Sequence, residues 1–135
     1  MKGVLVDSNI LLDVFTEDKL WMNWSESRLD YYRSKHTLFI NPIVYAEISI
    51  RFDDVEELED VLKIGGFLMR EIPKEALFLA GKAFLAYRKR GGSRRSPLPD
   101  FFIGAHAAVE KIPLLTRDAK RYKIDFPTVD LVSPE

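Results

Sequence analysis

Short apolar runs alternate with segments of helical character along this chain, and that alternation restricts the fold more than any other feature. The runs at 4–6, 37–40 and 112–115 are compact and rich in branched apolar residues, which is typical of buried strands. A further strand is expected over 129–132. Strands that alternate with helices pair in parallel, so the sequence predicts an α/β fold of three layers (α/β/α), with a central, mostly parallel sheet between helices.

Residues that start and stop helices separate these elements. Asn41 is a suitable N-cap, and Pro42 suits the first helical position, where its missing N–H costs nothing. From Asp53 onward, acidic residues surround apolar ones at helical spacing, which predicts an amphipathic helix that ends at Gly65-Gly66. No repeat or linker is long enough to divide domains, so residues 1–135 are expected to form one domain.

Composition excludes several classes of function. Apolar residues make up 47% of the 135 residues and charged residues 30%, which is the balance of a folded globular chain. Cysteine is absent, and this removes thiolate metal sites, redox chemistry and cysteine nucleophiles. The N-terminal apolar runs are short and interrupted by polar residues. Neither a signal peptide nor a membrane span is therefore expected, and a cytoplasmic protein is predicted.

Positive charge is concentrated in one segment. The formal net charge is −1, so any affinity for nucleic acid must come from a local patch rather than from overall charge. Such a patch occurs in YRKRGGSRRS, where the glycine pair predicts a flexible loop rather than a helix. The basic residues of this segment are Arg88, Lys89, Arg90, Arg94 and Arg95.

Four acidic residues occupy positions where they are expected to face the interior or the sheet edge. Asp7 and Asp118 follow predicted strands, at the edge of the sheet where ligands gather in open α/β folds. Glu47 shares a helical face with Ile50, and Asp100 lies on a similar apolar face, so both carboxylates are predicted to point inward. Each also has an ordinary alternative role as a helix cap, a turn residue or the partner of an arginine.

Four carboxylates in one pocket require compensating positive charge. Two ionised carboxylates about 4 Å apart repel by roughly 4 kcal/mol at an effective dielectric constant near 20. Divalent cations would relieve this repulsion, and ligation by oxygen alone favours Mg²⁺ or Mn²⁺ over Zn²⁺. The histidines are not expected to take part, because His106 lies far around its helix from Asp100 and His36 is expected to be solvated at a helix end.

Four segments, in order and over nearly the whole chain, resemble the motifs of the PIN domain, and in particular of the VapC-type toxins of prokaryotic toxin–antitoxin pairs. VLVDSNILLDVF is similar to the opening strand and turn of that family, and NPIVYAEI is similar to its second element, with Glu47. LPDFFIGAHAA resembles the third element, with Asp100, and LLTRDAKRY resembles the fourth, with Thr116 and Asp118. Each motif alone is short, whereas four in sequence at suitable spacing are specific.

The fourth motif departs from the family's pattern. Many relatives carry Thr-Arg-Asn followed by Asp-Phe, whereas this chain has Asp118 at the Asn position and Arg121-Tyr122 in place of Asp-Phe. Three roles are therefore open for Asp118: binding a metal directly, binding it through water, or orienting the site.

The resemblance implies a PIN-like domain that hydrolyses RNA as a metal-dependent endoribonuclease with Mg²⁺ or Mn²⁺ as cofactor. The implied catalytic and metal-binding residues are Asp7, Glu47, Asp100 and, as the fourth, Asp118. The residues that would orient water or the carboxylates are Ser8, Asn9 and Thr116. The residues that would contact RNA phosphates are Arg94, Arg95 and Arg117. Arg117 has an equal alternative as a solvated side chain or the partner of a buried acid.

The resemblance also implies a small antitoxin partner and a homodimer. Phe15, Trp21 and Trp24 either line a groove for an amphipathic helix of a partner or belong to the core. Two other functions stay open: a PIN-like module that binds RNA or protein without cleavage, and a PIN nuclease of RNA processing that has no antitoxin. The intact set of acids favours cleavage over binding alone.

Overall fold

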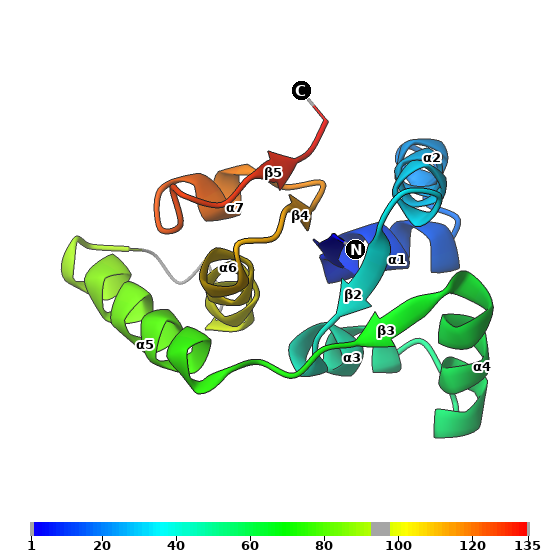
Figure 1. The fold of residues 1–135 in the computed structure, drawn as a ribbon, viewed down its shortest axis with the longest axis horizontal. Coiled ribbons are helices and arrows are strands. Elements are labelled where there is room, and N and C mark those ends of the chain that lie inside the picture. The colour runs from blue at the N-terminus through cyan, green and yellow to red at the C-terminus, as the bar shows by residue number, and fades with distance from the viewer. Residues whose placement is uncertain (1, 93–97, 135) are drawn as a thin grey trace.

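A five-stranded parallel sheet forms the centre of the computed structural model, which describes residues 2–92 and 98–134 (Figure 1). The strands are β1 (Gly3–Val6), β2 (Thr37–Ile40), β3 (Phe67–Met69), β4 (Leu114–Leu115) and β5 (Leu131–Val132). Their order across the sheet is β3-β2-β1-β4-β5, and every neighbouring pair is parallel. The predicted α/β class with a parallel central sheet is confirmed.

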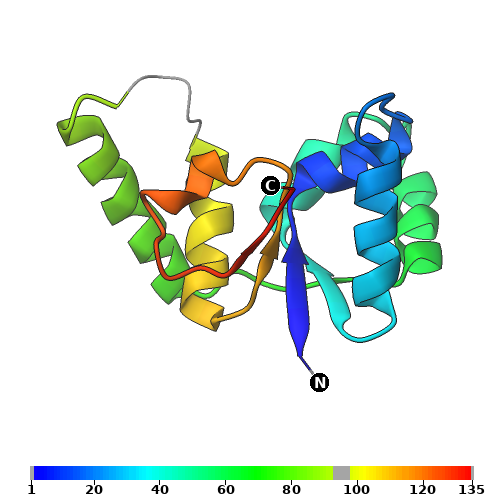
Figure 2. The ribbon, with the colours of Figure 1, turned by 90° about the horizontal axis from the view of Figure 1, so that it is seen from above.

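Helices lie on both sides of this sheet, as the two ribbon views show (Figure 1, Figure 2). They are α1 (Ser8–Phe15), α2 (Met22–Arg33), α3 (Pro42–Ser49), α4 (Val55–Gly65), α5 (Lys74–Lys89), α6 (Leu98–Glu110) and α7 (Lys120–Lys123). On one side α1 packs against α2, and on the other α5 packs against α6, which also contacts α7. Because α3 contacts both α1 and α6, it brings the two helical layers together.

Strand β1 occupies the middle of the sheet, and all four of its residues are buried. The chain adds β2 and β3 on one side of β1 and then returns to add β4 and β5 on the other. In open α/β sheets, ligands bind beyond the carboxyl ends of the strands at the point where the strand order changes direction. Asp7 directly follows β1 and Thr116 directly follows β4, so both residues lie at this point.

Helix boundaries follow the capping residues of the sequence. The Asn41 side chain accepts a hydrogen bond from the Val44 backbone N–H at 2.9 Å, and Pro42 begins α3, as predicted. Asp54 caps α4 in the same way, through the backbone N–H of the residue three positions later. Gly66 ends that helix with a φ of 78°, a left-handed conformation that glycine adopts without strain.

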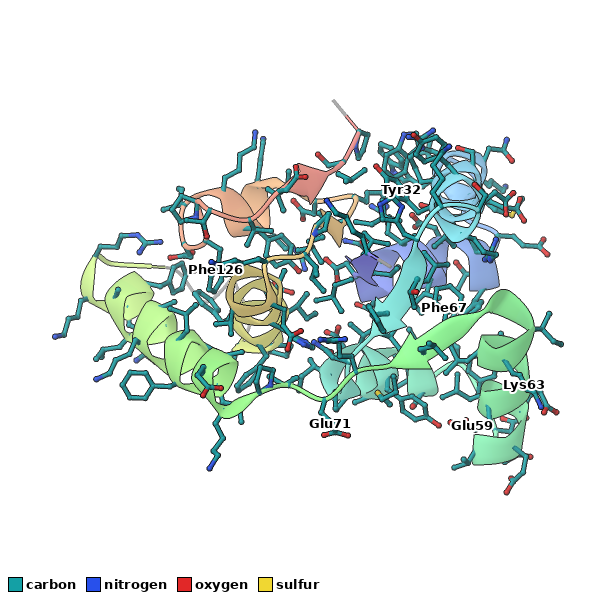
Figure 3. The ribbon with its side chains drawn as sticks, viewed as in Figure 1. Tyr32, Glu59, Lys63, Phe67, Glu71 and Phe126 are labelled. Carbon is teal, nitrogen blue, oxygen red and sulfur yellow. The ribbon has the colours of Figure 1, made fainter. Side chains whose placement is uncertain are left out.

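Aromatic rings position α6, the helix that carries Asp100. A Cβ built on Gly104 of this helix would lie 2.4 Å from the ring of Phe126, so the ring packs directly on the helix backbone (Figure 3). Phe101 makes T-shaped contacts with Phe126 and with Phe84, at centroid distances of 5.9 and 5.3 Å. These contacts hold α6 against α5 and against the segment that follows α7.

The basic segment differs from its sequence prediction. Helix α5 runs to Lys89, so Arg88 and Lys89 belong to its last turn rather than to a glycine loop. The chain leaves the helical conformation at Arg90, and Gly91 follows with a φ of 81°. The helix extends this far because its apolar face, ending at the buried Tyr87, continues to pack against the core. Arg94 and Arg95 lie outside the described residues.

Two further expectations are corrected by the structure. Ile50 was expected on the buried face that carries Glu47, but it is 80% exposed. The buried residues of α3 are Val44 and Ile48, and Ile50 lies about 200° around the helix from Ile48. The sequence did not predict strand β3, whose last two residues are exposed. None of the helices within the described residues is long and apolar enough to span a membrane.

Candidate active site

Asp7 is almost fully buried at the carboxyl end of β1. Its Oδ2 accepts hydrogen bonds from the Tyr122 hydroxyl at 2.7 Å, from Thr116 Oγ1 at 2.8 Å and from Asn9 Nδ2 at 3.5 Å. Within the described residues, the side-chain partner of its Oδ1 is the Ser8 hydroxyl, at a longer 3.4 Å. Neutral donors therefore hold one oxygen of Asp7 firmly, while the other stays available to a further partner.

Ser8 links Asp7 to the second acid, Glu47. The Ser8 hydroxyl donates to Oε1 of Glu47 at 2.7 Å, and Glu47 projects half-buried from α3. Its Oε2 has no hydrogen-bond donor among the described residues. Because α1 and α3 follow the neighbouring strands β1 and β2 and contact each other, they bring Ser8 and Glu47 together.

Asn9 and Thr116 tie the ends of β1 and β4 together. Asn9 Nδ2 donates to Thr116 Oγ1 at 3.3 Å, and Asn9 Oδ1 accepts the backbone N–H of Arg117 at 3.2 Å. Thr116 Oγ1 also accepts the backbone N–H of Asp118 at 3.1 Å. Ser8, Asn9 and Thr116 are thus in contact with the acids or their supporting backbone, which is consistent with the orienting role expected of them.

An arginine joins the remaining two acids. Asp100 lies buried in the first turn of α6, and its Oδ2 accepts a hydrogen bond from Nη1 of Arg121 at 3.2 Å. Nε of the same arginine lies 2.7 Å from Oδ2 of Asp118. The guanidinium group therefore bridges the two carboxylates from α7, and the Arg121 side chain remains 44% exposed.

The four acids act on one another electrostatically. Burial raises the pKa of Asp7, and the hydrogen bonds to its carboxylate oppose that rise. Burial raises the pKa of Asp100 to about 6, an effect that Arg121 opposes and that the charges of Asp7, Glu47 and Asp118 strengthen. The pKa of Glu47 is also raised, by burial and then by the charge of Asp7. The acids predicted from the sequence thus lie in one electrostatic environment, in which full ionisation is costly without added positive charge.

The donor atoms suit a hard divalent cation. Asp7, Glu47 and Asp100 each use one carboxylate oxygen in a short or charged hydrogen bond. Among the described side chains, the other oxygen has no donor in Glu47 and Asp100 and only the 3.4 Å contact with Ser8 in Asp7. Carboxylate oxygens are the ligands that Mg²⁺ and Mn²⁺ prefer. As the described side chains stand, no three acidic or histidine residues are close enough to hold an ion together. The pocket therefore fits a metal ion in its chemistry, and binding one requires side chains to move.

Arg117 is engaged outside the pocket. Its Nε and Nη2 donate to the two carboxylate oxygens of Asp13 at 2.9 and 2.8 Å, and Asp13 is buried and also accepts from the Ser25 hydroxyl at 2.7 Å. The guanidinium carbon lies 5.4 Å from the centre of the Trp21 ring. Arg117 is therefore the partner of a buried acid, the alternative that the sequence left open. Contact between this residue and RNA stays a prediction.

The two histidines take no part in the acidic pocket that the structure describes. His106 is fully buried in α6, where its Nδ1 lies 3.1 Å from Asn41 Nδ2 and burial lowers its pKa. His36 was expected to be solvated, but its Nδ1 is buried and has no hydrogen-bond partner in the described part of the chain. It packs against the Tyr32 ring at a centroid distance of 5.4 Å, which explains this difference.

Two residues of the pocket were not predicted as site residues. In the sequence, Arg121 and Tyr122 stand out only as a departure from the family's fourth motif. Both contact the acids, Arg121 through Asp100 and Asp118, and Tyr122 through Asp7. The spacing of three residues between Asp118 and Arg121 was a local signal for their contact, whereas no local signal indicated the contact of Tyr122 with Asp7.

Fold and pocket together define a class of protein: a parallel α/β structure with acids gathered at the carboxyl edge of its central strands. The family model described as the PIN domain matches residues 4–127, a range that contains all four acids, and the chain belongs to the PIN domain family. No curated protein matches the chain.

Several solved structures share this fold. The structure of VapBC2 from Rickettsia felis bound to a promoter DNA fragment has a TM-score of 0.74 and 20% sequence identity to this chain. The match covers 98% of this chain and 99% of that chain. DNA-bound VapBC from Salmonella typhimurium has a TM-score of 0.73 at 16% identity and covers 98% of both chains. VapBC-1 from nontypeable Haemophilus influenzae has a TM-score of 0.73 at 15% identity and covers 97% of both.

Proposed function

We propose that this protein is a metal-dependent endoribonuclease that hydrolyses phosphodiester bonds in RNA and acts as the toxin of a VapBC-type toxin–antitoxin pair. The observation that carries the proposal is the acidic pocket. In a chain of the PIN domain family, four carboxylates share one electrostatic environment, and three of them have one oxygen without a short hydrogen bond from any side chain that the structure describes. Such an arrangement lowers stability if it serves only a structural role, whereas metal-assisted chemistry makes use of it.

Asp7, Glu47 and Asp100 would hold Mg²⁺ or Mn²⁺, with Asp118 at the exposed rim of the pocket. Hydrolysis would draw on the ion for activation of water and for stabilisation of negative charge on the phosphate. The chain's own groups orient the acids. The hydroxyl groups of Tyr122 and Thr116 fix Oδ2 of Asp7, and the Ser8 hydroxyl fixes Oε1 of Glu47, so the second oxygen of each acid is held in place.

RNA would reach the pocket across a local basic surface, because the net charge of −1 gives no general attraction. Arg88, Lys89 and Arg90 are exposed at the end of α5 and lead into the segment that contains Arg94 and Arg95. Contacts between these arginines and RNA phosphates would add affinity with little dependence on base sequence.

The proposed partners are a small antitoxin and a second copy of this chain. Three structural neighbours are described as VapBC assemblies, and they cover nearly the whole of this chain and of their own. The Trp21 and Trp24 rings are only half-buried and meet edge to face at 6.2 Å, while Phe15 meets Phe52 at 5.4 Å. These partly exposed rings suit contact with an apolar helix of an antitoxin. We place the pair in the cytoplasm, where its RNA substrate is.

Cleavage of a structured RNA by the purified chain tests the proposed activity. We expect products with Mg²⁺ or Mn²⁺ and none with EDTA or with Asp7→Asn, a change that keeps the size of the side chain and removes its charge. Asp30→Asn is the matched control, since Asp30 is an exposed acid paired with Arg33 on α2. Cleavage that persists in Asp7→Asn would contradict the assignment of the pocket.

The toxin role and the alternatives need separate measurements. Growth arrest on expression, relieved by co-expression of a small protein encoded beside this one, would support the toxin. Cleavage without growth arrest would favour a PIN nuclease of RNA processing that has no antitoxin. RNA binding without cleavage in the presence of any metal ion tested would favour a binding module. The pairing of Arg121 with two of the acids is compatible with that role.

A further inference from the structure

Arg121 places a positive charge inside the acidic pocket. It contacts Asp100 through Nη1 and Asp118 through Nε, and its charge opposes the raised pKa of Asp7, Glu47 and Asp100 alike. Asp100 is 5% exposed at its side chain, and Arg121 is the cation that the described structure places against it. Arg121 therefore already supplies part of the compensation that a metal ion would supply.

We propose that Arg121 is a tethered cation that competes with the divalent ion for Asp100 and so weakens metal binding by the pocket. This inference rests on the proposed metal-dependent function. A divalent ion bound to Asp100 and the guanidinium group of Arg121 would share the same carboxylate. Two positive charges that close together repel strongly. Arg121 must release Asp100, or the ion is held less tightly.

The two bonds of Arg121 differ in a way that allows this exchange. Its contact with the buried Asp100 is the longer one, 3.2 Å, whereas its contact with Asp118 is 2.7 Å, and the Asp118 side chain is 39% exposed. Asp118 is also only three residues before Arg121, so their contact is local and can persist when Arg121 leaves Asp100. On binding of an ion, Arg121 would give up its longer contact with Asp100 and keep its contact with Asp118 at the rim.

The side chain has room to move. Arg121 is 44% exposed, and α7 spans only four residues, Lys120–Lys123. Its Nη2 makes no hydrogen bond to any other residue that the structure describes. The neighbouring Tyr122 is fully buried and bonded to Asp7, which anchors α7. The exposed side chain of Arg121 can therefore change position while the helix stays in place.

Titration calorimetry with MnCl₂ on the purified chain tests this proposal. We expect Arg121→Gln to bind Mn²⁺ at least about tenfold more tightly than the wild type, which corresponds to about 1.4 kcal/mol. Arg121→Lys keeps the charge but loses the two-pronged contact, so its affinity should fall between the two. Arg70→Gln is the matched control. Arg70 is 43% exposed and paired with Glu110, which lies ten residues along α6 from Asp100, so its loss should leave Mn²⁺ affinity unchanged.

Thermal unfolding gives a second, independent measurement. Without metal, Arg121→Gln should melt below the wild type because the acids lose their cation, and Mn²⁺ should raise its melting temperature by more than it raises that of the wild type. Should Arg121→Gln not fold without metal, Arg121→Lys carries the same comparison.

Equal Mn²⁺ affinity in the wild type, Arg121→Gln and Arg121→Lys would overturn the role of Arg121 and leave the metal-dependent function standing. Absence of Mn²⁺ binding in all of them would overturn the metal-dependent function, and this inference with it. The two failures are therefore distinguishable in the same titration.

Discussion

Replacing Tyr122 by phenylalanine removes one hydroxyl group from the centre of the pocket. In the folded protein this hydroxyl donates to Oδ2 of Asp7 at 2.7 Å, and both residues are buried. A hydrogen bond to a charged group contributes about 1.5–3 kcal/mol to stability, whereas a bond between neutral groups contributes about 0.5–1.5 kcal/mol. We therefore expect Tyr122→Phe to lower the free energy of unfolding by about 1.5–3 kcal/mol where Asp7 is ionised, and by less where it is protonated.

The sign of the pH dependence follows from the pKa of Asp7. Burial raises this pKa, and the Tyr122 hydrogen bond is the strongest of the contacts that oppose the rise. Without the hydroxyl, folded Asp7 holds its proton more tightly, so the stability lost in Tyr122→Phe grows as pH rises through the folded pKa of Asp7. Urea unfolding of both proteins over a series of pH values, from acidic to neutral, measures this difference directly.

Tyr45→Phe is the matched control for this experiment. The Tyr45 hydroxyl also donates to a carboxylate at 2.7 Å, that of Glu59, but this pair lies at the protein surface. Water replaces a surface hydrogen bond at little cost, so the loss of stability should be several-fold smaller than in Tyr122→Phe. Equal losses in the two variants, or a loss in Tyr122→Phe that does not change with pH, would refute the reasoning.

Two other predictions follow from packing and from charge. Gly104→Ala should destabilise the protein by about 1–3 kcal/mol, because the added methyl group meets the Phe126 ring. Gly81 of α5 has open space around it, so Gly81→Ala should stabilise the protein by about 0.5–1 kcal/mol. Urea unfolding measures both changes in stability. The pKa of Asp100 is raised to about 6, so protons compete for this carboxylate and Mn²⁺ affinity should fall as pH drops below that value. In the metal-free protein Asp100 favours folding at low pH, a contribution that is lost as pH rises through about 6. Calorimetric titrations at several pH values check the affinity, and an unchanged affinity below that pH would contradict the role of Asp100.

Much of the fold was predictable because its signals are local. The apolar run that became β1 is buried at every residue, and Asn41 caps α3 through its own side chain. Strand β3 carried no such signal, because Leu68 and Met69 are 56% and 46% exposed and the strand exists through its pairing with β2. The end of α5 was misjudged for a similar reason: packing of Tyr87 on the core extends the helix toward the glycines.

The pocket was predictable in its acids and not in its contacts. Asp7, Glu47 and Asp100 each sit where strand ends or helical faces direct a side chain inward, and the structure brings their charges together. The pairing of Arg121 with Asp100 depends on how α7 packs against α6, an arrangement between segments that no local pattern describes. The bond between Arg117 and Asp13 likewise spans 104 positions along the chain, so the sequence could only leave that role open.

The hydrogen bonds around Asp7 also set the order in which this pocket can be assembled during synthesis. Asp7 emerges from the ribosome early, but two of the hydroxyl groups that hold its carboxylate belong to Thr116 and Tyr122, which lie 109 and 115 residues later in the chain. A nascent chain of the first hundred residues therefore carries Asp7 without these two partners. The acidic pocket is therefore completed only when translation of the chain is nearly finished.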